Sequence, residues 1–365
     1  MTDLRVGVIG TGVGLAHLFA IGAVDRMEIG AVCDVDETRA EKSAADFGAP
    51  AFGDPAVLFA SGSIDAVVIA TPGATHAALT REALDAGLHV YCEKPITPTS
   101  DEGYALARYA RDRDKVLVVG FQHRYNPRYV AVADAVRELG PLRRFELRAT
   151  NWFRSQHYFD VSPWRATWRM AGGGVLMNQA IHQLDALIAI AGMPTRVSAR
   201  VSVRAHRTET EDEALAWLEW HDGATGSLVA SLNDATGEER FQCTCERGAV
   251  VLSADGVVRR IAHDATREIV DAATESEPPL VRHWQEVDTG KYSEFDMFKN
   301  MHRNFAAAIL DGAKPRVDGE EGTQAVELAN AIYMSSVAGE PVDLPLDRGA
   351  YPPVFEELSL GDRSI

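Results

Sequence analysis

The chain is predicted to fold as an α/β domain with a doubly wound parallel sheet, followed by an α+β domain with a large, mostly antiparallel open sheet. Short apolar strands alternate with helical segments over the first third of the 365 residues, which is the pattern of a parallel sheet covered by helices. After Gly140-Pro141 longer stretches alternate polar and apolar residues, which is typical of antiparallel strands. We expect the two domains to span residues 1–122 and 123–365.

The composition is that of an ordinary soluble globular protein, with 46% hydrophobic and 24% charged residues. The formal net charge of −17 argues against nucleic acid or an anionic membrane as a partner, because both favour basic surfaces. The N-terminus has no signal-peptide pattern and no apolar run is long enough to span a bilayer, so we expect a cytoplasmic protein. The sequence contains no Cys-x-x-Cys or His-x-x-x-His pair, and we predict no metal site.

Strands and helices alternate regularly in the first domain. The segment from Ile64 to Ala70 is almost wholly apolar, as a strand buried on both faces of a parallel sheet requires. The expected strands cover residues 5–9, 28–33, 64–70, 89–92 and 115–120. The expected helices begin near Gly14 and cover 36–47, 77–86 and 101–113.

The second domain is predicted to begin with a helix over 128–139, because Asn126-Pro127 is a turn signal. The alternating segments predict strands over 143–153, 197–206, 213–221, 226–233, 240–246 and 257–262. A further helix is expected to run from the glycines at 172–174 to about Ala191. Two helices, 293–310 and 320–336, are expected to precede a mostly irregular tail from Gly339 to the C-terminus.

A glycine turn, residues 10–14, lies between the first strand and the first helix. Such a turn lets backbone N–H groups approach a pyrophosphate at the helix N-terminus. The usual G-x-G-x-x-G spacing would need glycine at position 15, where Leu15 stands, and Gly14 comes one residue early. Asp34 ends the second strand, about 20 residues beyond, where an acid binds the ribose hydroxyls and repels a 2′-phosphate. We therefore expect NAD rather than NADP, although Arg39 softens this preference and Asp34 has an alternative role as a helix N-cap.

Two further polar segments are candidates for chemistry. Lys94 lies in the Glu-Lys-Pro turn, residues 93–95, directly after a buried strand, where open α/β sheets bind ligands. A solvated lysine in a loop is the alternative. In the predicted helix after the glycine run, Asn178, His182 and Asp185 share one face. His182 is suited to general acid–base work near neutral pH, and a hydrogen-bonded core histidine is the alternative.

These segments occur in an order that resembles the glucose–fructose oxidoreductase / inositol dehydrogenase / rhizopine-catabolism (Gfo/Idh/MocA) family over nearly the whole chain. The resemblance implies a Rossmann domain and a second domain whose open sheet packs against another subunit, giving a homodimer or homotetramer. It implies hydride transfer between a nicotinamide and a carbon bearing a hydroxyl on a sugar or cyclitol, with Lys94 near that hydroxyl and His182 as acid or base. Many members carry an aspartate where Asn178 stands, and an amide orients a hydroxyl but cannot take its proton.

The expected reaction is an NAD(P)-dependent oxidation of a polyol or sugar hydroxyl. The alternatives are an NAD-retaining glycosidase or lyase that oxidises its substrate transiently, and a non-catalytic nucleotide-binding sensor. The residues expected to be catalytic are Lys94, His182 and Asn178. The residues expected to bind the cofactor are Gly10, Thr11, Gly12, Val13, Gly14, Asp34, Arg39, Thr71, Pro72, His76, Glu93 and Lys94. The residues expected to bind the substrate are Arg124, Tyr125, Arg154, Tyr158, Trp164 and Asn178.

Overall fold

The computed structural model describes residues 3–280 and 283–362, and the chain divides into two compact units. The first unit holds the chain up to Tyr125 together with Arg169–Gly172 and Tyr292–Val326. The second holds Asn126–Trp168, Gly173–Lys291 and the chain from Glu327 onward. The first division lies close to the predicted boundary, but the prediction of two consecutive domains did not include the later return of the chain to the first unit.

The first unit is built on a six-stranded parallel sheet in the order β3-β2-β1-β4-β5-β6. This order confirms the predicted doubly wound fold. Successive strands of the chain are added on one side of β1 as far as β3, and then on its other side from β4 to β6. Ligands of open α/β sheets bind beyond the carboxyl ends of the strands at such a point. The strands are β1 (Leu4–Ile9), β2 (Met27–Cys33), β3 (Ala51–Phe52), β4 (Ala66–Ile69), β5 (His89–Cys92) and β6 (Leu117–Val119).

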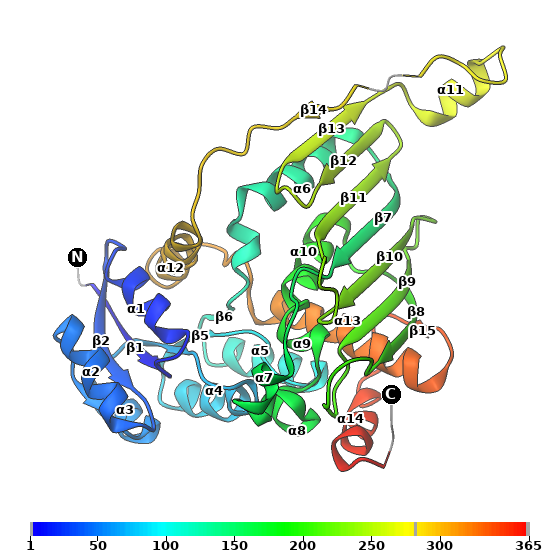
Figure 1. Ribbon diagram of the computed structural model, residues 1–365. Helices are drawn as coiled ribbons and strands as arrows, with labels where there is room; N and C mark the ends of the chain where they lie inside the picture. The colour runs from blue at the N-terminus through cyan, green and yellow to red at the C-terminus, as the bar shows by residue number, and fades with distance from the viewer. Residues whose placement is uncertain (1–2, 281–282, 363–365) are drawn as a thin grey trace. The chain divides into compact units, whose positions relative to one another are not determined.

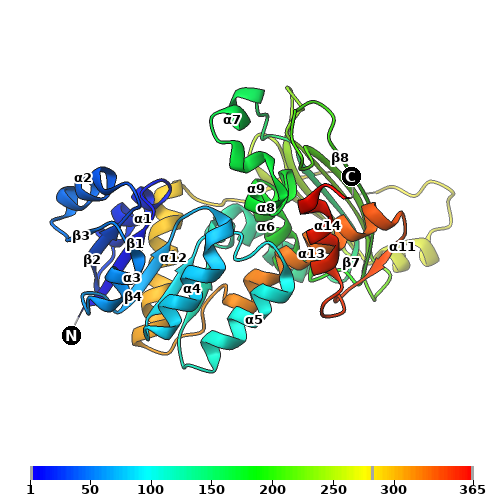
Figure 2. The same ribbon diagram turned by 90° about the horizontal axis from the view of Figure 1, so that it is seen from below.

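Helices pack on this sheet, and α4 and α5 lie side by side in Figure 2. The helix α12 belongs to the same core, because Met301 and Phe305 are buried in one cluster with Val6 and Leu18. It begins at a capping box in which the Ser293 hydroxyl and the Asp296 carboxylate satisfy each other's backbone N–H groups. The helices are α1 (Gly14–Ile21), α2 (Glu37–Phe47), α3 (Pro55–Ala60), α4 (His76–Asp85), α5 (Ser100–Arg111) and α12 (Glu294–Leu310), with 3₁₀ turns η1 (Gly73–Thr75) and η2 (Gln122–Tyr125).

The second unit contains a nine-stranded sheet in the order β14-β13-β12-β11-β7-β10-β9-β8-β15, visible as a row of arrows in Figure 1. All neighbours are antiparallel except β7 and β10, which confirms a mostly antiparallel sheet. The strands are β7 (Leu142–Ala149), β8 (Arg196–Ser202), β9 (Glu213–Glu219), β10 (Thr225–Ser231), β11 (Glu239–Cys245), β12 (Gly248–Leu252), β13 (Val258–Ala262), β14 (Gln285–Glu286) and β15 (Val342–Asp343).

The helices of the second unit leave part of this sheet open. The helix α6 packs on β11, β12 and β13, and α10 packs on α6 and β7. Exposed side chains alternate with buried ones along β9, where Leu215 and Trp217 face solvent. The remaining helices are α6 (Pro127–Leu139), α7 (Gln156–Asp160), α8 (Trp168–Ala171), α9 (Val175–Asn178), α10 (Ile181–Ala191), α11 (Thr266–Ala272), α13 (Gly319–Ala338) and α14 (Tyr351–Leu360), with the 3₁₀ turn η3 (Pro163–Ala166). Of these, α8 from Arg169 and α13 up to Val326 belong to the first unit. Among the described residues, no helix is long and apolar enough to cross a membrane.

Two local predictions were wrong. The helix expected from the glycine run to Ala191 is broken at Gln179, so Asn178 ends α9 while His182 and Asp185 lie on α10. The Asn178 amide donates back to the Gly173 carbonyl (2.9 Å), and asparagine side chains compete with helical hydrogen bonds in this way. The tail expected to be irregular contains α14, because its two prolines stand at the start of the helix, where no N–H donor is needed.

Candidate functional site

Each glycine of the glycine turn has a distinct steric role. Gly10 has a φ of +89°, and a Cβ there would lie 2.6 Å from the Ala70 carbonyl oxygen, so only glycine fits. Gly14 is the first residue of α1, and a Cβ there would lie 3.1 Å from the Val8 side chain, so glycine lets the helix approach β1 closely. A Cβ on Gly12 would meet nothing within 4 Å. The shortened turn therefore keeps an open backbone surface at Gly12 that fits a dinucleotide pyrophosphate.

Asp34 lies beside this turn, and its carboxylate is held by four donors. Its Oδ2 accepts from the backbone N–H (2.8 Å) and hydroxyl (2.7 Å) of Thr11, and its Oδ1 accepts from the Asp36 N–H (3.0 Å) and Arg39 Nη2 (2.9 Å). Burial alone would raise the pKa of Asp34, but these hydrogen bonds and the Arg39 charge outweigh burial and lower it. The N-cap of α2 is Asp36, whose side chain accepts from the Arg39 N–H, so Asp34 does not cap that helix.

His76 was predicted to contact the cofactor, but its imidazole is only 1% exposed and lies beneath two turns. Its Nδ1 is 2.7 Å from the Pro95 carbonyl oxygen and its Nε2 is 2.9 Å from the Thr71 carbonyl oxygen. Thr71 and Pro72 precede the 3₁₀ turn η1, where the Thr71 hydroxyl pairs with that of Thr75 (2.7 Å). The imidazole therefore joins the chain segments that follow β4 and β5.

The Glu-Lys-Pro turn follows β5, and its Lys94-Pro95 peptide bond is cis. The buried Glu93 carboxylate lies 3.0 Å from His17 Nε2 and accepts from the Lys94 N–H (3.1 Å). Burial alone would raise the pKa of Glu93, but His17 and the Lys94 charge lower it. Lys94 is half-buried, and burial lowers its pKa while the Glu93 carboxylate opposes that shift.

His17 and His302 extend this arrangement into the core, since His17 Nδ1 is 2.9 Å from His302 Nε2. Both histidine rings are fully buried and stand edge to face at 5.1 Å. The sequence interpretation gave neither residue a role. His17 lies three residues after the glycine turn, and His302 lies on α12 among both polar and apolar residues, so neither was singled out as a candidate.

Glu211 anchors the glycine run of the second unit and was also missed. Its carboxylate accepts from the backbone N–H groups of Gly174 (2.7 Å) and Leu176 (2.9 Å) and from the Tyr333 hydroxyl (2.8 Å). Burial raises the pKa of Glu211 to about 7 despite these three donors. The side chain thus fixes the start of α9, four residues before the break at Gln179 that separates Asn178 from α10. On α10 itself, His182 and Asp185 are both buried.

The predicted substrate residues Arg154, Tyr158 and Trp164 are brought together by Arg165. The Arg154 guanidinium stands 5.0 Å from the centre of the Tyr158 ring, and the Arg165 guanidinium stands 4.8 Å from Tyr158 and 4.7 Å from Trp164. Gln179 donates to the Tyr158 hydroxyl (3.0 Å), which ties this cluster to the break before α10. The cluster therefore lies next to the residues that precede that helix.

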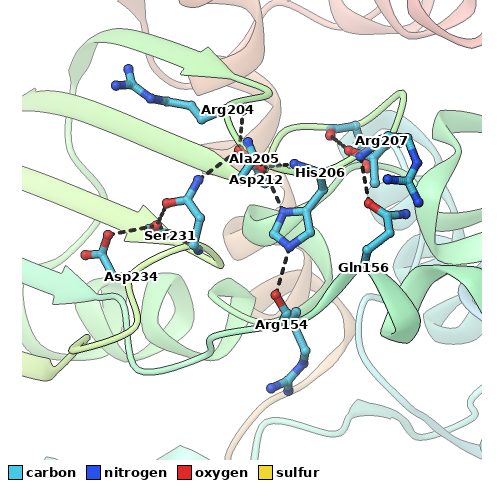
Figure 3. A network of polar contacts seen from close by, with 12 residues as sticks. Arg154, Gln156, Arg204, Ala205, His206, Arg207, Asp212, Ser231 and Asp234 are labelled. Atoms are coloured by element: carbon cyan, nitrogen blue, oxygen red, sulfur yellow. Dashed lines mark hydrogen bonds and ion pairs between the residues drawn. The ribbon is translucent and has the colours of Figure 1, made fainter.

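A buried carboxylate holds the segment that carries Arg154 (Figure 3). Asp212 accepts from the backbone N–H groups of Arg204 (2.8 Å) and Ala205 (2.9 Å), and it lies 2.8 Å from His206 Nδ1. On its other side His206 Nε2 donates to the Arg154 carbonyl oxygen (2.8 Å). The backbone of Arg154 is thus fixed while its side chain reaches toward Tyr158.

Two further substrate candidates, Arg124 and Tyr125, lie in η2 of the first unit and are half-buried. The Tyr125 hydroxyl donates to Asn304 Oδ1 (2.8 Å) and the Arg316 guanidinium covers its ring at 5.2 Å. Burial raises the pKa of the Tyr125 hydroxyl above its usual value. Within the described residues no group of three or more His, Cys, Asp or Glu side chains could hold a metal ion.

Two family descriptions match the chain. One is "Oxidoreductase family, NAD-binding Rossmann fold", over residues 4–121, and the other is "GFO/IDH/MocA C-terminal domain", over residues 129–251. The chain belongs to the Gfo/Idh/MocA family. It is therefore an enzyme, an NAD(P)-dependent oxidoreductase, and the resemblance predicted from its motifs is confirmed.

Relatives within the Gfo/Idh/MocA family match almost the full length. D-xylose 1-dehydrogenase (NADP(+)) 2 of Haloferax volcanii is 31% identical over 93% of this chain and 100% of its own. Inositol 2-dehydrogenase 2 of Paenarthrobacter aurescens is 32% identical over 91% of this chain and 96% of its own. Among solved structures, the WlbA dehydrogenase from Bordetella pertussis, in complex with NADH and UDP-GlcNAcA, has a TM-score of 0.81 and 28% identity over 94% of this chain and 100% of its own.

Proposed function

We propose that this protein transfers a hydride between a nicotinamide cofactor and a secondary hydroxyl or ketone of a sugar, sugar derivative or cyclitol. The observation that carries the proposal is the open backbone at Gly12. Gly12 follows β1 and Lys94 follows β5, so both residues lie beyond the carboxyl ends of strands in the same parallel sheet. The relatives support the substrate class, because they are named as dehydrogenases of xylose and inositol.

We also propose that the protein is located in the cytoplasm and that it forms a homo-oligomer through the exposed face of the nine-stranded sheet.

We propose NAD as the preferred cofactor. The glycine turn would hold the pyrophosphate, and a ribose hydroxyl would replace Arg39 as a donor to Asp34 Oδ1, because all four lone-pair positions of the carboxylate are already used. A 2′-phosphate would meet the negative charge of Asp34, although Arg39 is exposed and able to pair with it. The cofactor supplies the hydride acceptor or donor of the reaction. Thr71, Pro72, His76 and Glu93 would contribute by shaping the turns around it.

We propose that His182 takes the hydroxyl proton as the substrate is oxidised and that Lys94 binds the same oxygen. An imidazole has a pKa near working pH, which is the most effective range for a general base. The ammonium group of Lys94 would stabilise negative charge developing on the oxygen, and in the reverse direction the protonated His182 would return the proton. Asn178 would orient the hydroxyl through its amide.

The cluster around Tyr158 is the proposed substrate-recognition surface. Aromatic rings stack on the apolar faces of sugars, and guanidinium groups bind carboxylates and phosphates. Arg154, Tyr158 and Trp164 would provide these contacts, and Arg124 and Tyr125 are the other residues proposed to bind the substrate.

The direct test is a screen of polyols, aldoses, cyclitols and sugar phosphates with NAD and NADP, followed by absorbance of the reduced cofactor. With a substrate in hand, His182→Ala and Lys94→Ala should each lower kcat at least 100-fold, roughly the contribution of one acid–base group. The matched controls are His221→Ala, at an exposed turn, and Lys42→Ala, on the exposed side of α2. Near wild-type turnover in His182→Ala would refute the proton-acceptor assignment. Substrate consumption without accumulation of reduced cofactor would identify an NAD-retaining glycosidase or lyase instead.

A further inference from the structure

His76 makes a pair of contacts that a neutral histidine cannot satisfy. The ring lies at the start of α4 and is 1% exposed. Its two nitrogens lie 2.7 Å and 2.9 Å from two backbone carbonyl oxygens, those of Pro95 and Thr71. A carbonyl oxygen only accepts hydrogen bonds. A neutral imidazole has one N–H and one lone pair, so one of the two contacts would set lone pair against lone pair.

We propose that His76 is a positioning residue which, as an imidazolium, fastens the turn at Thr71 to the Glu-Lys-Pro turn and thereby fixes the location of Lys94. Only the imidazolium donates from both nitrogens, and buried donors and acceptors are paired in folded proteins. The two turns follow β4 and β5, which are neighbours in the sheet. This inference rests on the proposed function of Lys94.

The surroundings of His76 favour the charged form. Burial by itself would lower the pKa of His76, but the Cys92 sulfur on β5 and the two carbonyl oxygens outweigh burial and raise it to about 9. Cys92 is the titratable group that faces the ring. Glu93 and Lys94 belong to the same turn, where the Glu93 carboxylate faces His17 on the other side.

The Glu-Lys-Pro turn is consequently held at both ends. Its first residue, Glu93, is fixed through its carboxylate by His17 on α1. Its last residue, Pro95, is fixed through its carbonyl by His76 on α4. The Lys94 backbone lies between these two attachments, so its amine is carried by a short segment with little freedom to move.

His89 provides an internal comparison with the opposite protonation state. Its Nδ1 accepts from the Val116 backbone N–H (3.0 Å), which requires a lone pair on that nitrogen. Burial and the charge of Lys115 lower the pKa of His89 to about 4. Near pH 7 the two histidines of the same unit should therefore differ in charge, His76 being an imidazolium and His89 a neutral imidazole.

The test begins with proton–nitrogen correlation spectra of the full-length protein labelled with ¹⁵N-histidine, assigned with His76→Gln and His89→Gln. Two protonated ring nitrogens on His76 near pH 7, with His89 neutral, support the proposal, and the His76 signals should titrate near pH 9. A neutral His76 at pH 7 overturns it. This readout needs neither substrate nor cofactor, so it stays decisive even if a variant is too unstable for kinetics.

Kinetics then test the positioning role. His76→Gln keeps a donor for one carbonyl only, so kcat should fall roughly tenfold or more through displacement of Lys94, and the wild-type decline of kcat above about pH 9 should disappear. His89→Gln should leave kcat close to the wild-type value. Wild-type kcat with an unchanged pH profile in His76→Gln overturns the role. Wild-type turnover in Lys94→Ala overturns the proposed role of Lys94 instead, whatever the charge of His76.

Discussion

Replacing Gly12 by alanine should separate cofactor binding from folding. The added Cβ meets nothing within 4 Å in the protein, and the backbone there is compatible with alanine, so the apo protein should keep or slightly gain stability, by about 0.4–1 kcal/mol. The same methyl group would stand where a pyrophosphate oxygen approaches the backbone N–H groups. Loss of one such charge-assisted hydrogen bond costs about 1.5–3 kcal/mol, which is roughly a 10- to 150-fold weaker affinity for NADH.

The matched control is Gly22→Ala, at the other end of α1. Gly22 has a φ of −63°, and its Cβ would lie no closer than 3.6 Å to any neighbour, so this variant makes the same chemical change away from the glycine turn. NADH affinity is measured by fluorescence titration and apo stability by urea unfolding, for both variants and the wild type. Gly12→Ala with wild-type affinity would refute the placement of the pyrophosphate at this turn. An equal loss of affinity in both variants would point to α1 as a whole.

Three further substitutions test the electrostatics and the packing. Arg39→Ala leaves the Asp34 charge unshared, so affinity for NADP(H) should fall about fivefold relative to NAD(H) in the same titration, a difference of about 1 kcal/mol for an exposed pair. Glu211→Gln turns an amide toward the Gly174 N–H and should lower the free energy of unfolding by about 1–3 kcal/mol near pH 5, where the wild-type carboxyl group is protonated. Because the pKa of Glu211 is raised to about 7, wild-type stability should fall as pH rises from its ordinary value of 4.5 through 7, and the glutamine variant should lack this step. Ser293→Ala removes the cap of α12 and should cost about 1 kcal/mol in urea unfolding. Unchanged unfolding midpoints in the last two variants would contradict these assignments.

The periodicity of apolar residues predicted most of the fold, because the faces that most elements bury can be read from their own sequence. The strand at Ala66–Ile69 is buried at every position, and its apolar run is visible in the sequence. The break between α9 and α10 has no such signal, since it depends on the Asn178 side chain bonding back to Gly173 and on Glu211 holding the glycine run. The strand Gly248–Leu252 was missed for a related reason. It pairs on both sides with β11 and β13, and its short sequence alone does not alternate clearly.

The candidate site likewise has residues that the sequence predicts and partners that it does not. The glycine turn, Asp34 and Lys94 follow strand ends at fixed spacings, so the sequence predicts them as candidates directly. The partners that fix them come from distant parts of the chain: His302 reaches His17 across 285 residues of sequence, and Tyr333 reaches Glu211 across 122. No local pattern encodes such a contact, because its existence depends on how complete elements pack.

The two histidines that hold the Glu-Lys-Pro turn do so with different hydrogen-bonding requirements. His17 faces one acceptor, the Glu93 carboxylate, and one ring nitrogen of His302, so a neutral imidazole that donates to Glu93 and accepts from His302 satisfies both contacts. His76 faces two acceptors and needs both protons. The buried Glu93 carboxylate and the His76 imidazolium then hold opposite ends of the turn that carries Lys94. Alkaline pH should therefore release the Pro95 end of the turn while leaving the Glu93 end attached, so that Lys94 loses its fixed position before the fold itself is lost.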